Sequence, residues 1–169
     1  AGATMSLSGH EGVTALARSS HESADWGLSR LLDGVTTSVP GSKGYSSEGN
    51  TTATADEWIQ LDLRSDTVLK SLVLHPRTDT VAVDGAMAGF PCEFEVALKA
   101  DGGAWTTVHR HESGEPVPSF PQVIDLYTVA GYPTARFVRI HASRLGAPAV
   151  DEPAVYRLQL AEIEINREG

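Results

Sequence analysis

The sequence has a single cysteine among its 169 residues, so no disulfide can form within the chain. It also lacks any run of apolar residues long enough to cross a bilayer. Basic residues are scarce, since 13 lysines and arginines stand against 22 aspartates and glutamates, which gives a net charge of -9. Nucleic acids and anionic membrane surfaces require a basic face, so this balance argues against both as partners.

What the sequence does have is glycine, proline and short apolar segments separated by turns. Only one segment, 28–32, looks like a turn of helix. About eight short strands with spaced turn signals predict an antiparallel β-sandwich. The clearest expected strands are 13–18, 57–63, 68–75, 92–98, 105–108, 123–127, 137–142 and 156–165.

The length fits one domain with a real core. We expect a loose lead-in at residues 1–12 and a single sandwich at 13–166. No signal peptide stands at Ala1, which is typical of a processed or excised module and is compatible with secretion. Two long loops, 35–56 and 77–91, are expected to meet at one end of the sandwich, where loops on a rigid scaffold usually bind ligands.

The last expected strand, 156–165, changes phase along its length. Its apolar residues alternate as far as Leu160 and resume one residue out of step at Ile163. A one-residue slip turns the apolar side chains to solvent unless an extra residue is inserted, so the pattern predicts a bulge at Ala161–Glu162. The freed carbonyl and the adjacent carboxylate are ligands of the kind that calcium prefers.

A tight turn at Asp33–Gly34 is the expected partner of this bulge. With a neighbouring hydroxyl and carbonyl groups it would complete six oxygen ligands, a number that calcium accepts. An Asp-Gly pair also turns a chain without any metal, so the residues alone leave both interpretations open. The predicted calcium ligands are the carboxylates of Asp33 and Glu162, the hydroxyl of Ser38 and the carbonyls of Arg30, Val35 and Ala161.

Four segments in this order resemble the discoidin (F5/8 type C) superfamily: 31–37, 57–63, 135–140 and 160–165. The resemblance implies an eight-stranded antiparallel jelly-roll β-sandwich, all-β and galactose-binding-like. It also implies a structural calcium where the Asp-Gly turn meets the Ala-Glu of the last strand, which carries over onto the six residues above. Vertebrate members usually have a terminal disulfide, and its absence suits the bacterial carbohydrate-binding branch.

Within that branch, the segments 40–47, 75–79, 88–91 and 156–162 resemble modules attached to bacterial α-L-rhamnosidases (carbohydrate-binding module family 67). In the rhamnose-binding members a second calcium bridges the protein and sugar hydroxyls. The corresponding loop here reads Ser47-Glu48-Gly49-Asn50, where the family has Asp-Asn. Because of this departure, the sequence leaves it open whether a second, ligand-bridging calcium binds here.

Sugar sites combine planar polar side chains with an aromatic ring that covers the apolar face of the sugar. Arg77 with Asp79 is such a polar pair, although an ion pair that staples the loop is the alternative. Trp58 and Trp105 are assigned to packing, whereas aromatic residues in polar loops are expected to be exposed. The predicted ligand-binding residues are Tyr45, Glu48, Asn50, Arg77, Asp79, Asp84 and Phe90.

The resemblance therefore implies a non-catalytic, monomeric carbohydrate-binding module of a secreted bacterial glycoside hydrolase. Its partners would be a polysaccharide or oligosaccharide and the parent catalytic domain, with L-rhamnose as the first expected sugar and galactose or fucose as the second. An adhesion or lipid-binding discoidin domain is the alternative. A glycosidase is a third hypothesis, since two carboxylates at hydrolytic spacing could come from Glu48, Asp79, Asp84 and Asp151.

Overall fold

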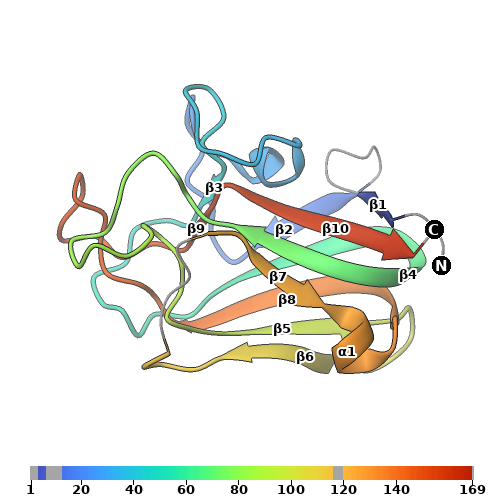
Figure 1. Cartoon of the computed structure of the whole chain (residues 1–169). Coiled ribbons are helices and arrows are strands. Elements are labelled where there is room, and N and C mark those ends of the chain that lie inside the picture. Colours follow the sequence, from blue (N-terminus) through green and yellow to red (C-terminus); the bar gives the residue numbers. More distant parts are fainter. Residues whose placement is uncertain (1–3, 7–12, 116–119, 169) are drawn as a thin grey trace.

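The computed structural model describes residues 4–6, 13–115 and 120–168, and every strand pair in it is antiparallel. The strands form a β-sandwich with little helix (Figure 1). The main sheet runs β1-β10-β4-β8-β5-β6, with β2 and β7 also paired to β4. The bounds are β1 Thr4–Ser6, β2 Thr14–Ala17, β4 Glu57–His75, β5 Glu93–Lys99, β6 Thr106–His111, β7 Gln122–Asp125, β8 Thr134–Arg144 and β10 Glu162–Glu168.

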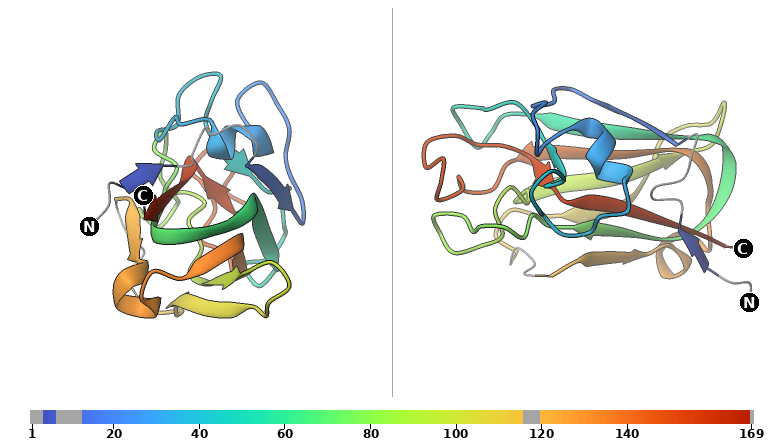
Figure 2. Two further views of the ribbon diagram at one scale, coloured as in Figure 1. Left: turned by 90° about the vertical axis from the view of Figure 1, so that its right-hand side faces the viewer. Right: turned by 90° about the horizontal axis from the view of Figure 1, so that it is seen from above.

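Strand β4 belongs to both layers of the sandwich, which Figure 2 shows from two further directions. Its first half pairs with β2 and β8, and its second half pairs with β10 and β7. The pairing with β8 shifts between Asp62 and Thr67, and Arg64 within this interval has a φ of 76°. The two strands expected at 57–63 and 68–75 are therefore one bent strand.

The expected alternation of buried and outward side chains is confirmed along the central strands. In β4, Ile59 and Leu61 are buried, while Trp58 and Gln60, which alternate with them, are partly exposed. The inward residues of β5 join the same core, although Cys92 just before that strand is only half-buried. Burial raises the pKa of the Cys92 thiol, which keeps it protonated at neutral pH.

The chain changes sheets at Ala161. Residues Gln159–Leu160 form β9, which pairs with β3 (Tyr45–Ser46) in a separate two-stranded sheet, and β10 then pairs with β4. The phase change is confirmed, because Leu160 and Ile163 are both buried. The expected bulge within one strand is wrong, since a break between two sheets produces the same apolar pattern.

Two smaller differences from the expected elements complete the fold. The helical turn η1 (Leu28–Leu32) occurs as expected, but the end of the expected strand 123–127 forms α1 (Leu126–Ala130), which is capped by the Asp125 side chain. Within the expected lead-in, Thr4–Ser6 form β1 on the edge of β10, and its other residues lie outside the described part. No helix in the described part of the chain is long and apolar enough to cross a membrane.

Three loops extend together from the end of the sandwich that lies opposite the two chain ends: 47–56, 76–92 and 145–158 (Figure 1). Backbone bridges join them, from Asn50 to Tyr156 and from Ala82 to Ala149. The two long loops singled out in the sequence therefore meet, and a third loop joins them.

Candidate functional site

Arg77 stands at the base of this loop end, two residues after β4. Its side chain is almost fully buried and binds Asp79 through two parallel bonds, Nε to Oδ1 at 2.6 Å and Nη2 to Oδ2 at 3.0 Å. Nη1 donates to Gln159 Oε1 at 3.0 Å, and Nη2 lies 3.4 Å from Asp151 Oδ2. These contacts hold the planar guanidinium in one orientation.

The surroundings of this pair keep both members charged. Burial alone would lower the pKa of Arg77, but the hydrogen bond and charge of Asp79 outweigh it, and the pKa is raised. Burial alone would raise the pKa of Asp79, but the bonds to Arg77 and Lys43 outweigh it, and the pKa is lowered. The guanidinium carbon also lies 4.9 Å from the centre of the Trp26 ring, so a cation–π contact supports it from one face.

A cavity of about 180 Å³ opens above Arg77. Side chains from the segment after β2, the first long loop, the end of β4 and the last loop form its walls. Two ion pairs border it, Lys43 with Asp79 at 3.3 Å and Arg157 with Glu152 at 3.1 Å. The lining residues are His21, Trp26, Lys43, Ser46, Arg77, Asp151, Glu152, Arg157 and Gln159. The arrangement offers fixed donors and acceptors to a small, hydroxyl-rich ligand.

A second site lies beneath η1, where the Asp33–Gly34 turn meets the start of β10. Glu162 is fully buried, and its Oε2 accepts the backbone N–H of Gly34 at 2.9 Å. Asp33 accepts the N–H of Val35 at 3.0 Å and the hydroxyl of Ser42, and Ser38 Oγ donates to the Lys43 carbonyl at 2.8 Å. The two distant segments expected to share a calcium are thus in contact.

The residues present at this second site fit a calcium ion. A buried carboxylate needs a compensating charge or hydrogen bonds, and the carboxylate of Asp33 and the hydroxyl of Ser38 are oxygen ligands of the kind that calcium prefers. The described residues contain no group of three His, Cys, Asp or Glu that could hold a metal, so hydroxyl and carbonyl oxygens would have to complete the shell. The Arg30 guanidinium donates to the carbonyls of Gly41 and Ala24, so only its own carbonyl, as expected, could serve.

The profile of the F5/8 type C domain matches residues 15–151. The chain belongs to the F5/8 type C family. A search of curated proteins by sequence found no match.

Solved structures of similar fold include carbohydrate-binding modules and a lectin domain. The family 32 module of Clostridium perfringens NanJ, in complex with galactose, has a TM-score of 0.69 at 18% identity and covers 98% of this chain and 100% of its own. A Clostridium perfringens module in complex with GalNAc-β-1,3-galactose has a TM-score of 0.66 at 15% identity, and the match covers 95% of this chain and 99% of that module. The lectin domain of lectinolysin, in complex with Lewis B antigen, has a TM-score of 0.63 at 16% identity, and the match covers 96% of this chain and 97% of that domain.

Two of the predicted ligand residues in this F5/8 type C domain lie in the core. Tyr45 and Phe90 have no exposed surface, so the expectation that they are exposed for sugar stacking is wrong. The Tyr45 hydroxyl donates to the Ser19 carbonyl at 2.5 Å, and Phe90 meets Phe94 edge to face at 5.6 Å. Tyr45 lies in the short strand β3 and Phe90 in the loop before β5, and both pack into the core although the sequence places them in the two long loops.

Three polar candidates do not line the cavity. The Asn50 amide donates to Glu57 Oε2 at 3.0 Å and to the Glu48 carbonyl at 3.3 Å, and is therefore used inside the protein. The exposed Glu48 is absent from the cavity lining, and the carboxylate of Asp84 closes its own turn by accepting the Ala86 N–H at 3.0 Å. Of the predicted ligand set, the structure brings together Arg77 and Asp79.

Four further lining residues in the F5/8 type C domain are not singled out as ligands by the sequence. His21, Lys43, Glu152 and Arg157 all line the cavity, and each comes from a different stretch than Arg77. No local pattern marks them, because only the folding of several loops over β4 places them together. Asp151 is suggested by the sequence only as a hydrolytic carboxylate.

Proposed function

We propose that this domain is a non-catalytic carbohydrate-binding module which holds the terminal sugar of a glycan above Arg77. The observation that carries the proposal is the buried Arg77 guanidinium, held in one orientation by Asp79, at the base of a small polar cavity. Vicinal sugar hydroxyls both donate and accept, and an oriented arginine beside carboxylates supplies both functions. At about 180 Å³ the cavity is below the usual size of small-molecule pockets, roughly 300 Å³ and more, and suits one sugar ring.

The finer assignments are part of this proposal. L-rhamnose is the first candidate, from the resemblance of four loop segments to rhamnosidase modules, and galactose or fucose is the second. The galactose-containing complexes of the NanJ module and its relative support the second. We further propose that the parent protein is a secreted bacterial glycoside hydrolase and that a structural calcium binds at Asp33 and Glu162.

Calorimetry with L-rhamnose, D-galactose and L-fucose, in the presence of calcium, tests the proposal. We expect weak saturable binding of at least one sugar, reduced about tenfold or more by Arg77→Lys, since one oriented charged donor is lost. His21→Ala, at a partly exposed lining residue, is a second variant that should weaken binding without unfolding the domain. No heat with any sugar would contradict the proposal, and turnover of nitrophenyl glycosides would contradict its non-catalytic part.

One observation favours the alternative of a lipid-binding domain. Val81, Val83 and Val150 are about half exposed (47%, 52% and 49%) at the tips of the joined loops. Apolar loop tips can insert into a bilayer, but the neighbouring Asp84 and Asp151 oppose an anionic surface. Sedimentation with phosphatidylserine vesicles separates the two functions, and we expect no binding to them.

A further inference from the structure

The outer face of the sheet formed by β4, β8, β5 and β6 is hollowed along a continuous line. Trp58, Gln60, Arg139 and His141 line a depression of about 340 Å³. It shares His141 with a depression of about 460 Å³ toward β6 and Gln60 with one of about 200 Å³ toward β2. Together they form a groove across the strands, lined by other residues than the loop-end cavity.

Strand register explains why these side chains share one face. Trp58 of β4 lies opposite His141 of β8, and Gln60 lies opposite Arg139. Their neighbours along β4 are buried, so the four side chains project outward. Trp58, which the sequence assigns to packing, is therefore partly exposed on the outer face of the sheet.

Three cations of this face lie over aromatic rings, and one of them is Arg136, 4.9 Å from the centre of the Phe137 ring. The Arg139 guanidinium carbon lies 4.2 Å from the centre of the Trp105 ring. Lys99 Nζ lies 5.9 Å from the same ring and 5.3 Å from that of Phe137. Within the described ranges, no carboxylate comes within 4.0 Å of Arg139 or Lys99.

The other arginines of the face behave differently. Arg110 is paired with Glu95 at 2.7 Å, and Arg136 is paired with Asp62 at 3.0 Å. In a chain of net charge -9, carboxylates are abundant, yet Arg139 and Lys99 stand apart from them. Cation–π contacts orient these two charges without neutralising them, so the part of the groove near Arg139 attracts an anion. The exposed Asp56 carboxylate lies 3.4 Å from His141 at the other side of the same depression.

We propose that this groove binds an extended stretch of an anionic polysaccharide. The indole of Trp58 offers a flat apolar surface to a sugar ring, the Gln60 amide can bond hydroxyls, and Arg139 with Lys99 receives a carboxylate or sulfate. The depressions lined by Trp58 and by Phe137, of about 340 and about 200 Å³, each exceed the loop-end cavity of about 180 Å³, and together they accommodate more than one sugar ring.

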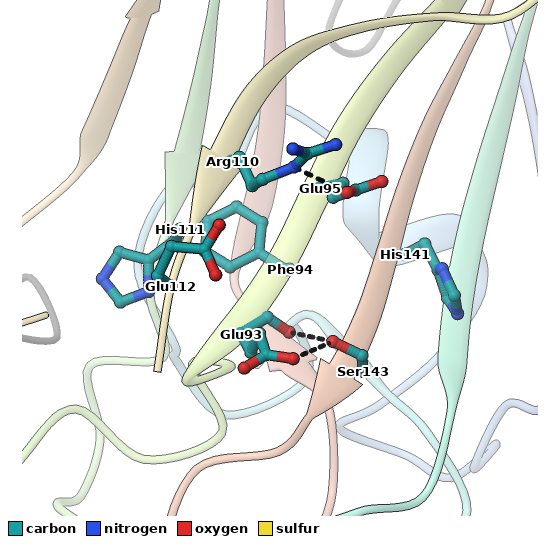
Figure 3. Close-up of a pocket in the computed structure, with 8 residues that line it drawn as sticks. All are labelled: Glu93, Phe94, Glu95, Arg110, His111, Glu112, His141 and Ser143. Atoms are coloured by element: carbon teal, nitrogen blue, oxygen red, sulfur yellow. Dashed lines mark hydrogen bonds and ion pairs between the residues drawn. The ribbon is translucent and has the colours of Figure 1, made fainter. Parts of the chain in front are cut away.

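The charges along the groove also limit where the anionic polysaccharide can lie. Toward β6 the groove is lined by Glu93, Glu95 and Glu112 (Figure 3). The Ser143 hydroxyl donates to Glu93 at 2.9 Å, and the Arg110–Glu95 pair closes the other side of this depression. An anionic chain is repelled from this end, so it must occupy the part between Trp58 and Phe137.

The three tryptophans of the chain allow the two sites to be observed separately. Trp26 lies beneath Arg77, whereas Trp58 and Trp105 lie on the groove face. NMR of the indole N–H groups, assigned with single Trp→Phe variants, reports each site. We expect a galacturonate tetrasaccharide to shift the signals of Trp58 and Trp105 and to leave that of Trp26 in place.

Fully methyl-esterified galacturonate tetrasaccharide is the matched uncharged ligand and should bind about tenfold more weakly or not at all. A κ-carrageenan tetrasaccharide, which carries sulfate without carboxylate, shows whether the groove accepts both anions or carboxylate alone. Equal binding of the esterified form, or shifts confined to Trp26, would overturn the proposal. So would shifts of Trp58 with polyglutamate but with neither saccharide, because the groove would then be a site for acidic peptides.

Arg139→Gln and Arg110→Gln provide matched variants, since each removes one positive charge from the same face. We expect Arg139→Gln, and Lys99→Gln to a lesser extent, to weaken galacturonate binding about tenfold, while Arg110→Gln changes it less than twofold. Equal losses from Arg139→Gln and Arg110→Gln would indicate general attraction and overturn the site. Neutral sugar binding at Trp26 should persist in all three variants, so failure of either site leaves the other measurable.

Discussion

At the scale of single residues, the buried carboxylate of Glu57 depends on three side chains. Arg18 Nη1 donates to it at 3.2 Å, Ser19 Oγ at 2.8 Å and Asn50 Nδ2 at 3.0 Å. A buried charge that loses one donor bears an uncompensated desolvation cost. Asn50→Ala should therefore lower the free energy of unfolding by about 1–3 kcal/mol, measured by urea titration.

The same substitution distinguishes a structural role for Asn50 from a ligand role. We expect sugar affinity in Asn50→Ala to remain within twofold of the parent, because the amide is already occupied. Thr51→Ala, at an exposed neighbouring residue, is the control and should change neither quantity. Lost affinity with unchanged stability would restore Asn50 to the binding site.

The Arg77–Asp79 pair predicts a pH dependence of stability. The pKa of Asp79 is lowered in the folded state, so the unfolded state takes up its proton first as the pH falls. The stabilisation is complete above the unfolded pKa of about 3.9 and is lost as the pH falls through the folded pKa. Asp79→Asn should thus lower stability at pH 7 by about 1 kcal/mol, a value typical of partly screened pairs, and less at pH 3.

Urea midpoints at pH 7, 5 and 3 measure this difference. Glu48→Gln removes an exposed carboxylate, and the difference between its urea midpoint and that of the parent should stay constant over the same pH range. A constant gap between Asp79→Asn and the parent at all three pH values would mean that the pair does not set the pKa of Asp79.

Individual residues also show how far the sequence can predict the site. The Arg77–Asp79 pair is recognisable, because two charged groups of planar chemistry lie close together in a single loop segment. Burial of Tyr45 and Phe90 is not, since it depends on Ser19 and Phe94 from other segments. The chemical type of a side chain can be read from a short segment, whereas its exposure depends on how distant segments pack together.

At the scale of elements, alternation of apolar residues predicts most strands, but it cannot predict how they are joined. The register of β4 with β8 shifts between Asp62 and Thr67, yet the two strands stay paired on both sides of the shift. In the sequence, a polar stretch between two apolar runs looks like an ordinary turn. Likewise, the slip at Ala161 fits a bulge as well as a change of sheet. Tertiary pairing decides between these outcomes.

The bend in β4 leads to a prediction of its own. Arg64 has a φ of 76°, a conformation that costs a non-glycine residue about 1–2 kcal/mol. Its exposed guanidinium lies 4.0 Å from Asp62, a contact of little value at the surface. Arg64→Gly removes the strain but adds freedom to the unfolded chain, so we expect a net gain of about 0.5 kcal/mol in urea unfolding.

Ser65→Gly is the matched control, because the adjacent exposed residue has no positive φ. It should lose about 0.5–1 kcal/mol, the usual cost of glycine in a strand. If Arg64→Gly lowered the free energy of unfolding as much as Ser65→Gly, the backbone at the bend would carry no strain that glycine can relieve.

At the scale of the whole molecule, the β-sandwich is predictable because strand patterns recur along the entire chain. The meeting of the Asp33–Gly34 turn with Glu162 also follows from two short motifs, and their contact at 2.9 Å is in the structure. The cavity cannot be derived in the same way. Its walls come from several distant stretches with no shared periodicity, and only the complete fold defines its volume.

The same meeting of distant segments makes calcium a test of the whole fold. A ligand that binds only the folded state stabilises it by about 2.7 kcal/mol at one hundred times its Kd. For a domain of this size that corresponds to a rise in Tm of about 5–10 °C. We expect the parent to lose this increment when a chelator replaces calcium in a thermal melt.

We expect the Tm of Asp33→Ala to be the same with calcium and with chelator, whereas Asp84→Ala should keep the calcium-dependent rise in Tm of the parent. The two aspartates are matched, because each carboxylate accepts the N–H two residues later at 3.0 Å, but the peptide that follows Asp33 donates to Glu162. If both variants lost the calcium-dependent rise in Tm, the loss would come from removing an aspartate from any turn and would not locate a calcium site at Asp33. If the parent melted identically with calcium and with chelator, the contact between η1 and β10 would be held by hydrogen bonds alone, and the proposed structural ion would be absent.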